Sequence, residues 1–290
     1  MSSRDETIRA LVEAAGDRGR PPLVMGVLNV TPDSFYDGGR YADPSMAIER
    51  GRELIALGAD IIDVGGESTR PGAVPVSDAE EMGRVLPVVK ALAGGRAAVS
   101  IDTRRAAVAK AALDAGAVVV NDVSGFARDP GMLALLGAER PVAIAMHMRG
   151  TPADMPARAS YRSVVADVAA ELWSGATRAC EAGLPLDRLW LDPGIGFAKT
   201  WDQSLALLGN LDVFARLGRP IVVGVSRKSF IGHVLDRPEP EGRLFGTAAA
   251  VALAVARGAR VLRVHDVAEM RDVVRVAHAV ATAGRWEVAA

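Results

Sequence analysis

Eight short apolar runs, each followed by a longer stretch with helical spacing, are the feature that most narrows the folds open to this chain. The runs are rich in Val, Ile and Leu, and they do not alternate strictly between apolar and polar residues. Runs of this kind are typical of a parallel sheet, in which both faces of each strand are buried. We place the strands at residues 23–30, 60–66, 97–103, 118–123, 141–147, 189–194, 220–226 and 259–266.

Segments rich in Ala, Leu and Arg fill the gaps between the runs. Helices are expected, for example, over residues 45–57, 78–92, 105–115, 160–182 and 243–257. Eight strand–helix units in one chain predict a (β/α)8 TIM barrel, an α/β fold in a single domain. An open doubly wound sheet is the alternative, but the sequence has no GxGxxG after the first strand and no P-loop. We expect an N-terminal extension over residues 1–20 and a barrel domain over residues 21–285.

Charge and cysteine content exclude several classes of protein. Lys plus Arg (34) nearly balance Asp plus Glu (35), so the basic excess of a nucleic-acid-binding protein is missing. The single cysteine, Cys180, excludes an intramolecular disulfide framework and a cysteine-based zinc site. The charged N-terminus lacks the apolar core of a signal peptide and either forms a short helix or frays. No apolar run reaches the roughly 18–20 residues of a membrane span. We therefore expect a cytoplasmic protein that binds neither nucleic acid nor membrane.

Polar side chains stand at the C-terminal ends of nearly all the predicted strands. In a barrel these ends share one face, and active sites are built there. A single polar residue at a strand end is often only a cap or a turn former. Because almost every strand ends this way, the pattern predicts the floor of a polar pocket. The residues are Asn29, Asp63, Asp102, Asn121, His147, Asp192, Ser226, Arg263 and His265.

Three of these residues suit a planar heterocycle. Asp192, in LDPGIGFAKT, would hold adjacent N–H groups with both oxygens, or it accepts backbone N–H bonds within its own loop. Asn121 offers a donor and an acceptor together. Asp102 is a second carboxylate at the same mouth, and an ordinary ion pair with Arg104 or Arg105 is an equally open interpretation.

Basic groups gather at the ends of the last two predicted strands. Loops at this place in TIM barrels commonly carry an anion site, and arginine forks suit phosphate oxygens. A lone arginine is more often a solvated salt bridge, but several groups together favour anion binding. Gly224, in the same segment, would let a flat group approach the backbone closely. The polar groups are Ser226, Arg227, Lys228, Arg263 and His265.

The four histidines do not form a metal site by their spacing, because no HxH or HExxH pair is present. His233 and His278 have the spacing of surface or helix positions. A hard cation held by oxygen ligands stays open, with Asn29 as the candidate ligand beside a phosphate-bearing substrate.

Two polar loops, TPDSFYDGG after the first predicted strand and ESTRPGA after the second, both contain Pro and Gly. The first two strands of a barrel are neighbours, so we expect these loops to meet above the mouth. Mobile loops exclude water and complete catalytic sites in many enzymes. Both loops are therefore candidate lids.

Taken together, these segments resemble the dihydropteroate synthases, folate-pathway enzymes that sulfonamides target. The resemblance rests on MGVLNVTPDSFYDGG, DVGGESTRPGA, SIDT, NDVSG, MHMRGTP, DPGIGFAKT, GVSRKSFIG and RVHDV, in the family's order from about Met25 to Val267. It implies a pterin-binding TIM barrel, a homodimer and a magnesium-dependent transferase. Such an enzyme condenses 6-hydroxymethyl-7,8-dihydropterin pyrophosphate with p-aminobenzoate to give 7,8-dihydropteroate and pyrophosphate.

The resemblance also implies roles for individual residues. The pterin contacts would be Asp102, Asn121, Asp192 and Lys228, with Met146, Phe197 and Gly224. The pyrophosphate site would be Asn29, Arg70, Arg263 and His265, with Asn29 as the magnesium ligand. The p-aminobenzoate pocket would be Phe35, Thr69, Arg70, Pro71 and Ser226. The catalytic set would be Asp37, Asn29, Lys228, Arg263 and His265.

The residue patterns and the resemblance agree on the chemistry. A pterin has the guanidine-like edge that a carboxylate can hold, and pyrophosphate is an anion that cationic groups and a metal stabilise as it departs. Its departure favours a dissociative substitution that needs no side-chain nucleophile. The first loop would be a lid in which Phe35 walls the p-aminobenzoate pocket, Asp37 faces the developing cation, and Gly38 and Gly39 act as hinges.

Two other interpretations stay open. A corrinoid-dependent methyltransferase barrel would share Asn121 and Asp192, but it would not be expected to need TPDSF, STRPG or the SRK cluster. A catalytically silent relative that binds a pterin or a partner protein should have lost lid or phosphate residues, and none is lost. The departures from the family pattern, Tyr36 and Ala198, remove no proposed contact.

Overall fold

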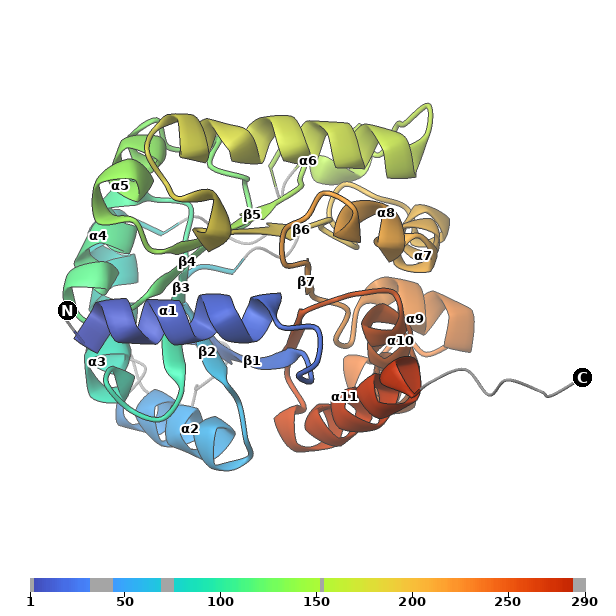
Figure 1. Cartoon of the computed structure of the whole chain (residues 1–290), viewed down its shortest axis with the longest axis horizontal. Helices are drawn as coiled ribbons and strands as arrows, with labels where there is room; N and C mark the ends of the chain where they lie inside the picture. The colour runs from blue at the N-terminus through green and yellow to red at the C-terminus, as the bar shows by residue number, and fades with distance from the viewer. Residues whose placement is uncertain (1–2, 32–43, 69–75, 152–153, 284–290) are drawn as a thin grey trace, which may run out of the picture.

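Parallel strands form the centre of the computed structural model, which describes residues 3–31, 44–68, 76–151 and 154–283 (Figure 1). The eight strands are joined in the order β6–β5–β4–β3–β2–β1–β8–β7. A bridge between Leu191 and Ile221 joins β6 to β7 and closes the ring. The predicted TIM barrel is therefore confirmed, and the open doubly wound sheet is wrong. The strands are β1 Leu23–Asn29, β2 Ile61–Gly65, β3 Ala98–Asp102, β4 Val119–Asp122, β5 Val142–Met146, β6 Leu189–Asp192, β7 Val222–Val223 and β8 Val261–Val264.

Helices cover the outside of the barrel, and the five helices expected from the spacing are confirmed (Figure 1). Of these five, α6 differs most from the expectation, because it begins at Val164 and not at residue 160. The α-helices are α1 Ser3–Gly16, α2 Pro44–Ala56, α3 Asp78–Leu92, α4 Ala106–Asp114, α5 Gly131–Glu139, α6 Val164–Glu181, α7 Trp201–Gly209, α8 Leu211–Ala215, α9 Ser229–Leu235, α10 Leu244–Ala256 and α11 Val267–Thr282. Short 3-10 turns lie at η2 Met155–Arg158, η3 Leu186–Arg188 and η4 Pro240–Arg243. Among the described helices, none combines the length and the apolar character needed to cross a membrane.

Helices α3 and α7 begin where the side chain of the preceding residue satisfies a free backbone N–H. Ser77 precedes α3 and accepts the Glu80 N–H through its hydroxyl at 3.2 Å. Thr200 precedes α7 and forms a capping box with Gln203, in which each side chain accepts the other residue's backbone N–H. A cap of this kind stabilises a helix start by about 1 kcal/mol. The second cap matters for the site, because it ends the loop that follows β6.

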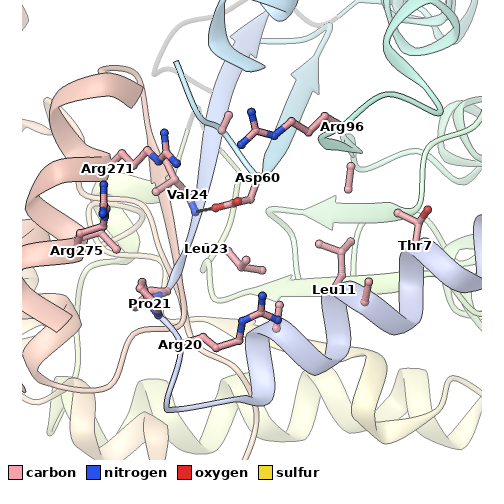
Figure 2. Close-up of a pocket in the computed structure, with 16 residues that line it drawn as sticks. Thr7, Leu11, Arg20, Pro21, Leu23, Val24, Asp60, Arg96, Arg271 and Arg275 are labelled. Atoms are coloured by element: carbon pink, nitrogen blue, oxygen red, sulfur yellow. Dashed lines mark hydrogen bonds between the residues drawn. The ribbon is translucent and has the colours of Figure 1, made fainter. Parts of the chain in front are cut away.

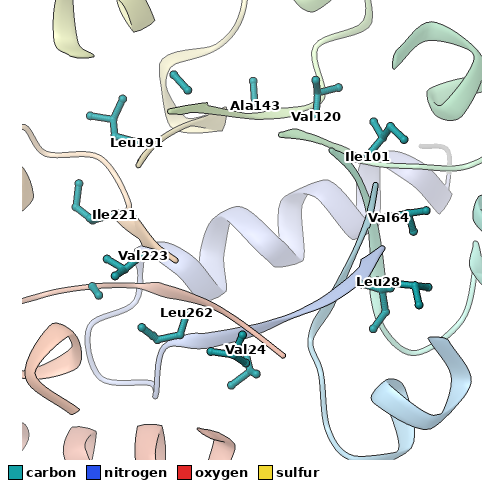
Figure 3. Close-up of a cluster of buried hydrophobic side chains, with 14 of the residues drawn as sticks. Val24, Leu28, Val64, Ile101, Val120, Ala143, Leu191, Ile221, Val223 and Leu262 are labelled. Atoms are coloured by element: carbon teal, nitrogen blue, oxygen red, sulfur yellow. The ribbon is translucent and has the colours of Figure 1, made fainter. Parts of the chain in front are cut away.

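Successive side chains of each strand point alternately to the outside and the inside of the barrel, and both faces of the strands carry buried side chains. The outward side chains, such as Val24, Val64, Ile101 and Leu262, form a ring between the strands and the helices (Figure 3). A second cluster, including Met25, fills the inside of the barrel near the ends where the strands begin. We call that end the base and the opposite end the mouth. Burial of both faces explains the lack of strict alternation in the sequence.

Helix α1 closes the base. Its apolar residues Ile8 and Leu11 pack on the inward cluster, together with Met25 and the fully buried Trp190. Arg260, which precedes β8, donates hydrogen bonds of 2.6–3.1 Å to four main-chain carbonyls in the last turn of α1 and the segment after it. The first of the two expectations for the N-terminus, a helix, is confirmed over residues 3–16. The proposed domain boundaries at residues 20 and 285 stay a prediction.

Candidate active site

Strand register brings polar residues to one level at the mouth. Asn29 is paired with Gly65 across β1 and β2, Gly65 with Asp102 across β2 and β3, and Asp102 with Asn121 across β3 and β4. These four residues therefore form a row across four neighbouring strands. The predicted polar floor exists here because parallel pairing aligns the strand ends.

An arginine from β8, the neighbour of β1 on its other side, binds carboxylates of β2 and β3. Arg263, on β8, donates from Nε to Asp63 Oδ2 at 2.6 Å and from Nη2 to Asp102 Oδ2 at 2.7 Å. Asn121 Nδ2 donates to the same Asp63 oxygen at 3.0 Å. Asp63 is fully buried, and its other oxygen has no hydrogen-bond partner among the described residues. The four side chains thus form one connected polar network across the barrel.

The ion pair that the sequence suggested for Asp102 is wrong. Arg104 binds Glu67, and Arg105 binds both Glu67 and Glu81. The two arginines follow β3, and their side chains reach the carboxylates of the β2 loop and α3. Asp102 remains inside the barrel mouth, where its partner comes from β8.

Burial and crowding shift the ionisation of this network. Burial raises the pKa of Asp102 to about 7, and the nearby charge of Asp63 adds to the rise, although Arg263 opposes it. Burial would lower the pKa of Arg263, but the two carboxylates outweigh burial and raise it. A charged arginine between two carboxylates, one of which titrates near neutral pH, is typical of a functional site.

Asp192, the last residue of β6, sits in a tightly folded loop at the mouth. Its Oδ1 accepts the Gly194 N–H at 2.7 Å, which matches the expectation that it accepts backbone bonds within its loop. Among the described residues, none donates a hydrogen bond to Oδ2. Gly194 has a φ of +66°, and a Cβ there would lie 1.9 Å from the His147 carbonyl oxygen, so only glycine fits. Asp192 therefore keeps one oxygen for a ligand.

Lys228 faces Asp192 from the next loop. Its ammonium group donates to the Ile195 carbonyl oxygen and lies 4.7 Å from the centre of the Phe197 ring. Burial lowers the pKa of Lys228 to about 8, although the charge of Asp192 opposes the fall, and burial raises the pKa of Asp192. A carboxylate, an ammonium group and an aromatic face thus meet at one point of the mouth.

Gly224 and Met146 complete the surroundings of this point. A Cβ on Gly224 would lie 3.8 Å from Lys228 Nζ and 3.9 Å from Arg263 Cβ, so both basic side chains stand beside it. Met146 ends β5 in register with Asp192 and is 4% exposed. The structure thus gathers Asp192, Lys228, Met146 and Gly224, four of the residues that the resemblance assigned to the pterin contacts.

The basic cluster at the ends of β7 and β8 is smaller than expected. The Ser226 hydroxyl accepts the His265 backbone N–H at 3.2 Å and contacts His265 Nδ1 at 3.0 Å. Arg227 is paired with Asp266, with its Nε 3.0 Å from Asp266 Oδ2. Both arginines of the cluster are thus paired with carboxylates, Arg227 with Asp266 and Arg263 with Asp63 and Asp102, so each already has an acidic partner.

Sequence reasoning missed the role of Lys199. Its Nζ lies 3.0 Å from His147 Nδ1 and donates to the Phe197 carbonyl oxygen at 2.8 Å, while His147 Nε2 lies 3.1 Å from Glu171 Oε2. Burial lowers the pKa of Lys199 to about 7 and that of His147 to about 4. This chain of contacts ties the β6 loop to β5 and α6. Lys199 lies within DPGIGFAKT, but a motif does not indicate where a long side chain turns.

Several predicted residues lie outside the described part of the chain. They are Phe35, Asp37, Gly38, Gly39, Thr69, Arg70 and Pro71. The predicted lid, most of the p-aminobenzoate pocket and one pyrophosphate contact therefore stay predictions. His233 and His278 do lie on helices, where His233 stacks on Trp201 with ring centroids 4.2 Å apart.

The predicted metal ligand, Asn29, ends β1 at the mouth. Within the described ranges, no three His, Cys, Asp or Glu side chains gather closely enough to hold a metal ion. A Cβ on Gly65 would lie 3.7 Å from Asn29 Oδ1, so this amide oxygen stands over a residue without a side chain. Mg²⁺ commonly takes one or two protein oxygens and completes its shell with phosphate oxygens and water. Asn29 is suited to supply such a ligand.

Comparison with known proteins agrees with this geometry. The family model for pterin binding enzymes matches residues 25–265. The dihydropteroate synthase of Mycobacterium leprae is 48% identical over 271 residues, which span 91% of this chain and 95% of that protein. The enzyme of Synechocystis is 44% identical over 264 residues, with 91% of each chain covered.

Solved structures give the same result. The dihydropteroate synthase of Xanthomonas albilineans with 4-aminobenzoic acid has a TM-score of 0.85 and 42% identity, over 91% of this chain and 94% of the other. Dihydropteroate synthases are transferases of folate biosynthesis. Because the match covers nearly the whole barrel at this identity, the chain belongs to the pterin binding enzymes and, among them, to the dihydropteroate synthases.

Proposed function

We propose that this chain condenses 6-hydroxymethyl-7,8-dihydropterin pyrophosphate with p-aminobenzoate, releasing 7,8-dihydropteroate and pyrophosphate. The proposal rests chiefly on the buried Asp192, which lies near Lys228 and Phe197. Its Oδ1 accepts the Gly194 N–H, and no described residue donates to its Oδ2, which can therefore bind a ligand. The Xanthomonas albilineans enzyme has been solved with 4-aminobenzoic acid and with 7,8-dihydropteroate, which supports the same amine substrate and the same product here.

The pterin would bind deepest. Asp192 Oδ2 would accept from the guanidine-like edge of the ring, because a carboxylate matches two adjacent N–H groups. Asn121 and Asp102 would hold the remaining polar atoms from β4 and β3. Lys228 would donate to a ring acceptor, while Phe197, Met146 and Gly224 would pack against its faces. This arrangement would satisfy polar groups that are costly to leave buried without a partner.

Pyrophosphate would lie between β1 and β8. Arg263 and His265 would bind its oxygens, together with Arg70. Magnesium, when bound beside Asn29, would neutralise charge on the leaving group. Cationic groups placed where negative charge develops stabilise a transition state without reorganisation. Arg263 is already held in place by Asp63 and Asp102, so it would meet the leaving group preorganised.

The substitution would be dissociative. The methylene C–O bond breaks, and its electron pair leaves with pyrophosphate. The carbon gains positive character that the pterin ring shares, and Asp37 would face it. The amine nitrogen of p-aminobenzoate, held among Phe35, Thr69, Pro71 and Ser226, would form the new C–N bond and then lose a proton. Closed loops would keep water from taking the place of the amine.

A coupled assay tests this proposal. Purified protein would be mixed with the dihydropterin pyrophosphate, p-aminobenzoate and Mg²⁺, and both pyrophosphate release and dihydropteroate mass would be followed. Product that requires both substrates is expected. Pterin binding without product would instead support the silent pterin-binding relative. A methylfolate-binding methyltransferase should show no thermal shift with pyrophosphate and Mg²⁺, whereas this chain should.

The role of Asp37 has its own test. Replacing Asp37 by Ala should lower kcat far more than it lowers pterin affinity, because the carboxylate would act on the cation and not on the bound ring. Asp37→Glu, which keeps the charge, should recover part of kcat. Equal losses of kcat and pterin affinity in Asp37→Ala would contradict this role.

We also propose that the chain forms a homodimer. Helix α10 is apolar almost all round, a pattern typical of a fully buried helix. Yet Phe245 is 82% exposed and Leu253 is 53% exposed. Ala249, one turn after Phe245, and Ala256, one turn after Leu253, are exposed on the same face of the helix. A second copy of the chain would cover this stripe. A cytoplasmic location is part of the same proposal, supported by the single cysteine.

A further inference from the structure

A cavity lies at the base of the barrel, at the end opposite the mouth. It has a volume of about 670 Å³ and is lined by α1, the start of β1, the segments before β2 and β3, and α11 (Figure 2). This volume is within the range of small-molecule sites, which is roughly 300–1,000 Å³. The proposed reaction uses nothing at this end.

Four arginines from three different parts of the chain line this cavity: Arg20 before β1, Arg96 before β3, and Arg271 and Arg275 on α11. None of their guanidinium groups has a hydrogen bond or an ion pair with a residue in the described ranges. The one acidic residue in the lining is Asp60, whose Oδ2 accepts the Val24 N–H at 2.8 Å. Figure 2 shows Arg96 and Arg271 reaching toward Asp60 from opposite sides. Positive charge is therefore in clear excess here.

Three of the four arginines act on the ionisation of Asp60. Partial burial raises the pKa of Asp60, and the charges of Arg271, Arg96 and Arg20 all act against that rise. One carboxylate offsets only part of the charge of four arginines, and like charges held together repel each other and disfavour the compact state. A bound anion would relieve this repulsion.

The backbone makes room for one of these arginines. Gly58 has a φ of +99°, and a Cβ at this position would lie 2.4 Å from Arg271 Nη1 and 2.7 Å from its Cζ. A side chain at residue 58 would therefore displace the guanidinium group. The guanidinium group of Arg271 therefore packs directly against the backbone at Gly58.

The shape and chemistry of the cavity indicate the ligand. Guanidinium forks match phosphoryl oxygens, and several forks match a ligand with several such groups. Leu11, Pro21 and Val274 add an apolar wall beside the charges. We propose that the base of the barrel binds a small polyanion with two or more phosphoryl groups, at a site separate from the one that binds the substrates.

Two metal-free probes test this site on the full chain by isothermal titration calorimetry: inorganic tripolyphosphate and ATP. Because the mouth also has basic groups, the Arg263→Gln variant is titrated alongside and should keep the base site. The double variant Arg96→Gln/Arg271→Gln should weaken binding about 10-fold or more, since it removes two charged donors. Equal affinity for both probes would indicate recognition of phosphoryl groups alone. Tighter ATP binding would indicate that the apolar wall contacts the nucleoside, and either result supports the site.

A matched double variant controls for net charge. Arg52→Gln/Arg216→Gln removes two exposed arginines that do not line the cavity, and it should bind both probes as wild type does. The proposal fails if neither probe binds the wild type, if Arg96→Gln/Arg271→Gln binds them unchanged, or if the control pair loses as much affinity. Thermal unfolding of each variant without probe verifies the fold.

Discussion

At the scale of single residues, the same side chain takes different roles according to its neighbours. Asp102 and Asp192 both end a strand at the mouth. Asp102 is paired with Arg263, whereas Asp192 accepts a backbone N–H and faces Lys228 without an ion pair within 4 Å. Asp102 is therefore part of a fixed network, and Asp192 is the carboxylate that keeps an oxygen for a ligand.

Replacing Asp192 by Asn should raise the dissociation constant for the pterin substrate about 10- to 100-fold, because a hydrogen bond to a charged group is replaced by a neutral and partly mismatched one. Titration of the pterin into the purified variant measures this change. Asp187→Asn, at an exposed position before β6 and away from the mouth, is the control and should bind as wild type does. Unchanged pterin affinity in Asp192→Asn would contradict the assignment of the pterin pocket.

The pH dependence of kcat/KM should report Asp102 and Lys228. If Asp102 acts as a carboxylate with a pKa of about 7, kcat/KM rises as the pH increases through that value. If Lys228 acts as an ammonium group with a pKa of about 8, kcat/KM falls as the pH increases through that value. A bell-shaped profile is therefore expected for the wild type.

The variant Lys228→Arg distinguishes ionisation of the enzyme from ionisation of the substrate as the cause of the falling limb. A guanidinium group stays charged well above pH 8, so the falling limb should move to higher pH even if the maximum is lower. Ionisation of the substrate is common to both enzymes and cancels in the comparison. Falling limbs at the same pH in both would show that Lys228 does not cause the decline.

At the scale of elements, α1 is part of the barrel's core and not an appendage. Its apolar face packs against side chains from the inside of several strands, and Arg260 binds the carbonyls at its end. Without this helix, the inward cluster at the base would be open to water. The same helix forms one wall of the arginine-lined cavity, so it serves both packing and the proposed anion site.

The contribution of α1 to stability can be measured with Ile8→Ala. Ile8 is 1% exposed, and truncating a buried Ile to Ala typically lowers the free energy of unfolding by about 2–5 kcal/mol. Denaturant titration followed by circular dichroism measures the change. Glu6→Ala, at an exposed position of the same helix, should alter stability by less than about 0.5 kcal/mol. A loss for Ile8→Ala no larger than that of the control would mean that α1 is not part of the cooperative fold.

At the scale of the whole molecule, the two ends and one flank of the barrel differ in chemistry. The mouth carries the polar network, the base carries the arginines, and α10 exposes an apolar stripe on the flank. A contiguous apolar surface of this kind usually marks an interface. The three surfaces are separate, so substrate binding, anion binding and dimerisation would each be testable without disturbing the others.

Dimerisation should depend on the stripe. The double variant Phe245→Asp/Leu253→Asp places charges on it and should shift the protein from dimer to monomer in sedimentation or light-scattering measurements. Met46→Asp, which puts a charge on an exposed apolar residue of α2, should leave the mass unchanged. A monomeric wild type, or a dimeric double variant, would refute the proposed interface.

By itself, the sequence determined the barrel, the order of its strands along the chain and the polar residues at their ends. Burial on both faces requires continuous apolar runs, and parallel strands bring their C-terminal ends to one face, so local composition is enough for these conclusions. The pairing of side chains was decided only by the tertiary structure. Asp63 and Asp102 pair with Arg263, which lies 200 and 161 residues away in the sequence. Asp102 does not pair with Arg104 or Arg105, which follow it closely in the chain. The docking of α1 and the convergence of four arginines at the base depend in the same way on closure of the ring, because long side chains pair by distance in space and not by spacing along the chain.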